Sequence, residues 1–149
     1  MPEQNQLTPS GHSLDDVEAM MLSGPQAPYE INHHFGPNIY IREAVIPAGT
    51  IVLGHAHRDA HICIILQGKM AALMGDKVVV VEAPATFVAG AGRKMAYIME
   101  DLIIQNVFST DETDIDKLED MLVDKTDLAK SYEVQAEIDM FRAMIEGVS

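Results

Sequence analysis

This sequence has little cysteine, little positive charge and no long apolar run. Its single cysteine, Cys63, excludes an internal disulfide and suits a reducing compartment. Lys and Arg number 10 against 23 Asp and Glu, and the resulting net charge of −13 argues against binding a nucleic-acid backbone. No apolar stretch reaches the ~20 residues of a membrane span, and Met1 to Ser10 do not resemble a signal peptide. We therefore expect a soluble cytoplasmic protein that binds neither nucleic acid nor membrane.

What is present indicates one globular domain in three zones. The chain has 149 residues, of which 48% are hydrophobic, enough for a core of its own. Residues 1–28 form a polar arm with one short helix, expected over Leu14 to Leu22 after Ser13 as N-cap. Residues 29–110 are expected to be β-structure, and residues 111–149 form an acidic helical segment.

The middle zone alternates short Ile- and Val-rich runs with turn residues. This spacing predicts a mostly β protein, either a sandwich or a small barrel. The turn residues Gly75-Asp76 predict a tight hairpin. The expected strands are Ile39–Ile46, Ile51–Leu53, His61–Gln67, Met70–Met74, Lys77–Val81, Thr86–Val88, Met95–Met99 and Leu102–Phe108.

The last zone changes to helical periodicity. Apolar residues recur at helix spacing in two sets, and the remaining positions are mostly acidic. We expect two amphipathic helices, which pack on the outside of the β-structure, form a dimer contact, or do both. The two sets are Ile115, Leu118, Met121, Leu122 and Val134, Ile138, Phe141, Ile145.

Three histidines, His55, His57 and His61, form the most informative pattern. Side chains of an extended strand alternate between its faces, so three odd-numbered histidines would point the same way. Three imidazoles on one face form a good site for a divalent transition metal and leave coordination positions open. The alternative is a histidine-lined pocket without metal that holds a polar ligand. The pair His33-His34 is expected to be structural or to line the rim.

The spacing of this segment resembles the first motif of the cupins. Gly49, five residues, His55-Ala56-His57, three residues, His61, six residues and Gly68 follow that motif, with His61 where cupins usually carry glutamate. A weaker second motif passes through Pro84 and places Met95 where a fourth metal ligand would be. The chain also resembles small single-domain cupins of bacteriophages.

The resemblance implies a single cupin-type jelly-roll β-barrel with a short N-terminal helix and one or two C-terminal helices. It implies a metal site of His55, His57 and His61 for Zn, Fe, Ni, Mn or Co, with Met95 as a further ligand. Cupins often pair through barrel faces, so a homodimer is expected. A viral origin would place the protein in the host cytoplasm.

Four further residues are candidates for roles at such a site. Glu43 is the best candidate general acid or base, because a carboxylate inside an apolar strand is costly unless used or paired. Tyr97 is expected to donate a hydrogen bond to a substrate, and Gln105 to orient a ligand. Arg42 is a candidate for an anionic ligand. Three of them have a plain alternative, in which Glu43 and Gln105 face outward and Tyr97 is a core aromatic.

Three functions remain open from the sequence. The first is a metal-dependent enzyme of the lyase, isomerase or dioxygenase type acting on a small polar molecule. The second is a binding protein that captures a sugar, nucleotide or signalling molecule without turnover. The third is an assembly protein, which leaves the spacing of the histidines unexplained.

Overall fold

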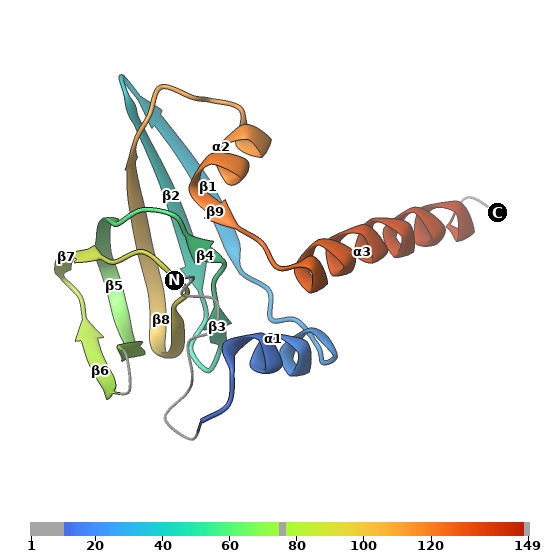
Figure 1. Cartoon of the computed structure of the whole chain (residues 1–149), viewed down its shortest axis with the longest axis horizontal. Helices are drawn as coiled ribbons and strands as arrows, with labels where there is room; N and C mark the ends of the chain where they lie inside the picture. Colours follow the sequence, from blue (N-terminus) through green and yellow to red (C-terminus); the bar gives the residue numbers. More distant parts are fainter. Residues whose placement is uncertain (1–10, 75–76, 148–149) are drawn as a thin grey trace.

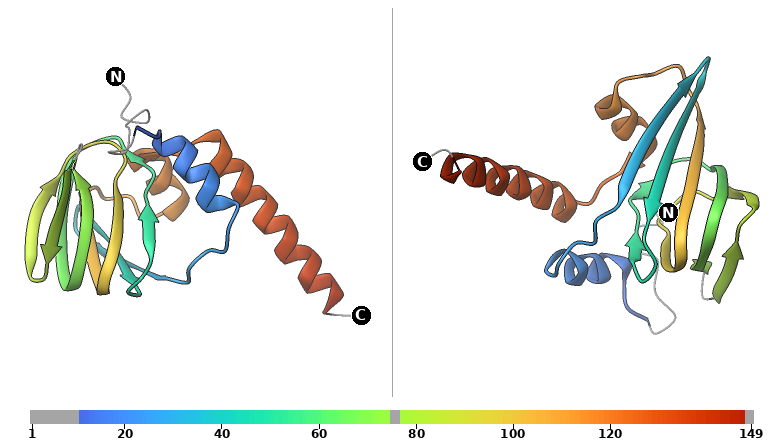
Figure 2. Two further views of the ribbon diagram at one scale, coloured as in Figure 1. Left: turned by 90° about the horizontal axis from the view of Figure 1, so that it is seen from below. Right: turned by 180° about the vertical axis from the view of Figure 1, so that it is seen from behind.

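The computed structural model describes residues 11–74 and 77–147, and over these residues it shows nine strands and three helices (Figure 1). The helices lie to one side of the β-structure (Figure 2). The strands are β1 (Glu30–Gly36), β2 (Ile39–Ile46), β3 (Ile51–Leu53), β4 (Ala56–His57), β5 (His61–Met74), β6 (Lys77–Glu82), β7 (Ala85–Ala89), β8 (Met95–Ser109) and β9 (Val123–Asp124). The helices are α1 (Leu14–Leu22), α2 (Ile115–Leu122) and α3 (Asp127–Glu146).

Two long strands, β5 and β8, organise the sheet. All pairings are antiparallel, in the order β1-β2-β8-β5-β6, with β3 added on β8 and β7 added on β5. The first half of β5 pairs with β7 and its second half with β6. The first residues of β8 pair with β3 and its last eight with β2. Each long strand therefore serves two sets of partners, which gives the antiparallel jelly-roll arrangement its two halves.

Gly68 allows β5 to pass close to β8. Its φ is +92°, a conformation that side chains rarely adopt, and the register between β5 and β8 shifts on either side of it. A Cβ at this position would overlap the carbonyl oxygen of Asp101 in β8. The sequence predicts a break between two strands here. The structure instead shows one bulged strand, because glycine lets the ladder continue.

The core lies between the two halves of the sheet. Ile65, Ile98 and Leu102 are at most 1% exposed and pack with four further buried side chains from β2 and β5. Complete burial of one such side chain contributes about 2 kcal/mol. A second cluster joins Tyr40 and Phe108 to Leu118. It packs α2 onto the edge of the sheet where β2 begins and the antiparallel β8 ends.

A buried arginine ties α1 to the rest of the chain. Arg93 is 1% exposed, and its guanidinium donates to Glu18 at 2.5 Å, to Asp15 at 3.1 Å and to the carbonyl of Gly54 at 2.9 Å. Glu18 also accepts a hydrogen bond from Thr126, the N-cap of α3. These contacts hold α1 and the start of α3 beside the segment that carries His55.

α3 leaves the body of the molecule and extends away from the sheet in every view (Figures 1 and 2). Its first two turns are held by Thr126, by the buried Ala129 and by the ion pair of Glu133 with Lys125. No helix in the described ranges is long and apolar enough to cross a membrane.

Several expectations about the elements are confirmed. The first helix covers Leu14–Leu22 with Ser13 as its N-cap, and two C-terminal helices follow the β-structure. The expected breaks at Gly68 and at Glu100-Asp101 are wrong, because β5 and β8 each run through them as one continuous strand. The expected Gly75-Asp76 turn lies outside the described residues. The zone boundaries at residues 28 and 110 stay predictions.

Replacing Gly68 with alanine should destabilise the fold by about 2 kcal/mol or more, since the new Cβ meets backbone that cannot move cheaply. Gly36→Ala is the matched control, because a Cβ there meets no atom within 4 Å. Urea unfolding of both variants measures the difference. Equal midpoints for the two would contradict the close crossing of β5 and β8.

Candidate functional site

A cavity of about 390 Å³, here called the main cavity, opens between the sheet and the helices. The inward face of the sheet forms its floor, and α1, the segment after it, α2, β9 and the start of α3 form its other walls. The polar residues that line it are Gln26, Tyr29, His33, Tyr40, Arg42, Thr50, His55, His57, Asn106, Glu119 and Glu133.

The three histidines reach this region from three backbone positions and not from one extended strand. His55 precedes the two-residue strand β4, His57 ends it, and His61 begins β5 after a bend. The backbone of His57 is fixed by two hydrogen bonds with Gly92, of 3.0 and 2.9 Å. His55 and His57 line the main cavity.

His57 and His61 lie ring against ring. Their centroids are 4.4 Å apart, and the ring of Phe108 lies 6.0 Å from the first and 4.9 Å from the second. Of the two stacked imidazoles, His57 lines the main cavity, and His61 is buried behind it against Phe108 of β8.

His61 is bound to Asn106 of β8. Its Nε2 lies 3.0 Å from the amide oxygen of Asn106, so Nε2 carries the proton and donates it. The same oxygen accepts from the thiol of Cys63 at 2.9 Å. Burial raises the pKa of Cys63 to about 11, so this thiol stays protonated and acts as a donor. Asn106 therefore holds His61 and Cys63 together.

The Nδ1 atoms of His55 and His57 are buried and have no hydrogen-bond partner among the described residues. Burial lowers the pKa of His57 to about 4, and the neighbouring His61 adds to this effect. The pKa of His55 is also lowered, first by burial and then by Lys125. Both rings are therefore neutral near pH 7, and each leaves a buried polar atom for a ligand to satisfy.

These residues do not form a three-histidine metal centre as they stand. Within the described chain no three His, Cys, Asp or Glu side chains are grouped so that they could hold a metal ion. His55 and His57 have an uncommitted ring nitrogen, but the Nε2 of His61 is committed to Asn106. The set of all three as metal ligands stays a prediction.

Arg42 brings a positive charge into the main cavity. It lies on the inward face of β2, across the ladder from Asn106. Its guanidinium makes no hydrogen bond and no ion pair with any residue that the structure describes. A partly buried guanidinium without a protein partner has five donors available to a ligand.

Tyr40 and His33 form the neighbouring wall. The Tyr40 hydroxyl and His33 Nδ1 are 2.7 Å apart, and their rings stack. Burial raises the pKa of Tyr40, so its hydroxyl stays protonated. The expectation that His33 is structural or lines the rim agrees with this position.

Glu43 and Gln105 face the opposite side of the sheet. Their side chains bond to each other at 2.7 Å, and the second carboxylate oxygen of Glu43 accepts from Asn32 at 3.1 Å. These two hydrogen bonds lower the pKa of Glu43, Gln105 having the larger effect. Neither residue lines the main cavity, so their expected roles as base and ligand contact are not supported by position.

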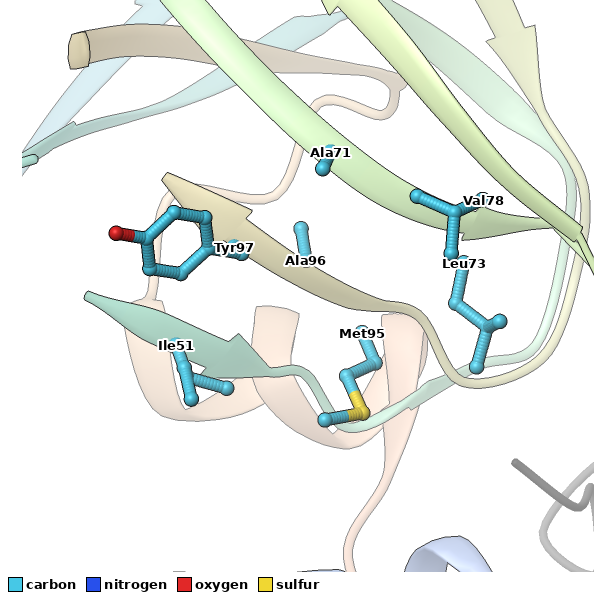
Figure 3. A pocket seen from close by; sticks show the side chains of 7 residues that line it. All are labelled: Ile51, Ala71, Leu73, Val78, Met95, Ala96 and Tyr97. Atoms are coloured by element: carbon cyan, nitrogen blue, oxygen red, sulfur yellow. The ribbon is translucent and has the colours of Figure 1, made fainter. Parts of the chain in front are cut away.

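Met95 and Tyr97 line a different hollow, here called the outer pocket (Figure 3). It measures about 240 Å³ and lies on the outer face of β3, β8, β5 and β6, away from the core. Its lining residues are Ile51, Ala71, Leu73, Val78, Met95, Ala96 and Tyr97. The structure does not bring Met95 or Tyr97 together with the histidines.

The sequence matches no protein-family model and no curated protein. Among solved structures, KdgF from Halomonas sp. superposes with a TM-score of 0.50 and 15% identity, over 64% of this chain and 89% of that one. An RmlC-like cupin from Shewanella frigidimarina gives 0.49 at 15% identity, over 63% and 85%. An RmlC-like cupin with a double-stranded β-helix fold from Methanocaldococcus jannaschii gives 0.47 at 14%, over 57% and 83%.

The fold of this chain is cupin-like. At these identities the likeness concerns the fold alone. The expectation of a mostly β, jelly-roll architecture with flanking helices is confirmed.

Asn106 and Phe108 are the site residues that the sequence analysis missed. Strand alternation contains the signal, since Asn106 must face the side opposite to Gln105. A polar residue on the inward face of an apolar strand needs a partner. Only the pairing of β8 with β5 shows that its partners are His61 and Cys63.

The low pKa of His57 predicts a loss of stability in mild acid. The unfolded chain takes up a proton near pH 6.5, and the folded protein does so only near pH 4. Stability therefore falls as the pH is lowered through this window, by up to about 3 kcal/mol from this residue. Urea unfolding at about pH 7, 5.5 and 4.5 should show a steeper loss for the wild type than for His57→Gln. Parallel losses in the two proteins would contradict the buried neutral ring.

Proposed function

We propose that this chain binds a small molecule with a carboxylate or phosphate group in the main cavity. The observation that carries the proposal is the guanidinium of Arg42, which is charged, lines the cavity and has no partner among the described residues. Guanidinium pairs with two oxygens of a planar or tetrahedral anion at once.

The buried histidines of the cavity favour a ligand that has a second polar group, at the end opposite to the anionic group that Arg42 binds. The buried Nδ1 atoms of His55 and His57 need partners, and both rings are neutral near pH 7. A hydroxyl or amide of the ligand satisfies a neutral imidazole nitrogen as donor or acceptor. A volume of about 390 Å³ suits a small metabolite and not a polymer.

The acidic residues at the cavity do not oppose an anion strongly. Glu119 and Glu133 line it, and both carboxylates are held by Lys125 at 2.8 and 3.0 Å. The ammonium offsets much of their charge. One formal negative charge remains on the helix side of the cavity, so an anion is expected to bind at the sheet side, next to Arg42.

The proposal is for binding and not for turnover. Glu43 and Tyr97, the candidate catalytic residues, lie outside the main cavity. A protein that captures a small anion without converting it needs no acid or base there. The likeness to bacteriophage cupins, which the sequence suggests, would suit such a sequestering role.

Arg42→Gln should weaken anion binding by about 10- to 100-fold, since it removes a charge-assisted pair while keeping a side chain of similar length. The probes are inorganic phosphate and succinate, with glucose as a neutral comparison. Isothermal titration and the rise in melting temperature with ligand concentration measure the effect.

Arg58→Gln is the matched control, because Arg58 is half exposed and pairs with Asp124 away from the cavity lining. It should leave the affinity unchanged. If neither phosphate nor succinate stabilises the wild type, or if both arginine variants behave alike, the assignment of Arg42 is wrong.

A second candidate is a divalent transition metal, either Zn, Fe, Ni, Mn or Co, at His55, His57 and His61. The two uncommitted ring nitrogens favour it. His61 would have to exchange its hydrogen bond with Asn106 for the metal. When bound, such an ion would supply Lewis-acid chemistry beside Arg42.

Titration of chelator-treated protein with Zn²⁺ or Ni²⁺ tests this candidate. His57→Ala should lower metal affinity at least about 10-fold, because losing even an outer-shell partner of a metal site costs that much. His34→Ala is the control, since His34 lies on the outer face near Glu43. No uptake by the wild type, or equal uptake by both variants, would exclude the histidine metal site.

A further inference from the structure

The side-chain amide of Asn106 is held in one orientation. Its oxygen accepts from His61 Nε2 at 3.0 Å and from the thiol of Cys63 at 2.9 Å, and both donors belong to β5. Because an imidazole N–H and a thiol both donate, the end of the amide that faces them is the oxygen and not the nitrogen. These two contacts therefore decide which end of the amide is left for the cavity.

The amide nitrogen of Asn106 points the other way. β8 lies between β5 and β2 in the sheet (Figure 1), so an oxygen directed at β5 leaves the nitrogen on the side of β2. Asn106 lines the main cavity, and no residue that the structure describes accepts a hydrogen bond from its NH2 group. Two N–H donors of this amide are thus available to a ligand.

Arg42 and Asn106 lie next to each other on the floor of the main cavity. They are directly opposite in the ladder of β2 and β8, and both line the cavity. Side chains in such a pair have Cβ atoms about 5 Å apart. The same row of the sheet continues to His33 on β1 and to Cys63 on β5, so these four positions include no carboxylate. The floor therefore presents a guanidinium beside an NH2 group, and both donate to an oxyanion.

The charges around the cavity suit a ligand with one negative charge. Arg42 and Lys125 balance Glu119 and Glu133, so the site is neutral before a ligand enters. Each uncompensated charge in a partly enclosed volume is costly. A carboxylate adds one such charge, whereas a phosphate group adds about 1.5 to 2 at pH 7. The balance therefore favours a carboxylate.

We propose that the ligand of the main cavity is a short monocarboxylic acid with a hydroxyl group, and that Asn106 donates to its carboxylate beside Arg42. This inference rests on the anion-binding function proposed above and narrows it to one class of ligand. The buried Nδ1 atoms of His55 and His57 are then the partners of the hydroxyl group.

The NH2 group of Asn106 can be observed directly in the wild-type chain by NMR. At least one of its two proton resonances should move downfield when 3-hydroxybutyrate or 4-hydroxybutyrate is added, because the short bond from an N–H to a carboxylate deshields the proton. The spectrum of Asn106→Asp identifies these resonances by their absence. The NH2 group of Asn32, which donates to Glu43 on the outer face, is the internal control and should not move.

The affinities of related probes measure the ligand class. Isothermal titration at about pH 8, where phosphate is mostly a dianion, compares the tighter of the two hydroxy acids with its amide, with butyrate and with inorganic phosphate. The wild type should bind the hydroxy acid at least about 10-fold more tightly than each of the others. The amide lacks the charge, butyrate lacks the hydroxyl group, and phosphate carries too much charge.

Asn106→Asp should weaken binding of the hydroxy acid about 100-fold or more, because it removes a donor and places a like charge beside the carboxylate. Its oxygens can still accept from His61 and Cys63, so the fold is kept. Asn38→Asp is the matched control, since it adds the same charge at an exposed turn between β1 and β2. It should leave the affinity within about 2-fold. Circular dichroism and the melting temperature check that both variants are folded.

The results separate this inference from the function on which it rests. If no carboxylate or phosphate binds to the wild type, the anion-binding function itself is wrong. If anions bind and Arg42→Gln weakens them, unmoved Asn106 resonances or an unchanged affinity of Asn106→Asp overturn the role of Asn106 alone. Phosphate that binds more tightly than the hydroxy acids overturns the monocarboxylate class and leaves the anion site in place.

Discussion

The pairing of β5 with β8 is the constraint on which the rest of the structure depends. These two strands run together for almost their whole length, and Gly68 lets them pass close enough to bend without separating. Every other strand of the main sheet is attached directly or indirectly to one of them. Because Asn106 faces Cys63 across this ladder, the same pairing builds the floor under His61.

The main cavity combines neutral rings with one unpaired cation. Burial keeps His55 and His57 uncharged, so they do not repel Arg42. The third histidine, His61, is bound through Nε2 to the side chain of Asn106. If they were solvated, His55 and His57 would be cationic in mild acid, as Arg42 is; their burial keeps them neutral. The positive potential of the cavity is concentrated at one guanidinium.

Sequence periodicity determined most of the elements. Ser13 and the spacing of apolar residues define α1, period-two alternation defines the strands, and period 3.6 defines α2 and α3. The cupin-like arrangement also followed from the motif that runs from Gly49 to Gly68. These features depend on residues that are close together in the sequence, so they can be predicted without the three-dimensional structure.

Only the tertiary structure decided which side chains meet. His55, His57 and His61 alternate in the sequence, but a bend at residues 58–60 breaks the strand, and His61 bonds to a residue 45 positions away. Glu43 and Gln105 pair on the outer face, while Arg42, one position from Glu43, enters the cavity. Alternation along β2 shows that Arg42 and Glu43 face opposite sides of the sheet. Which of the two sides faces the cavity depends on how the strands pair, and that pairing joins residues far apart in the sequence.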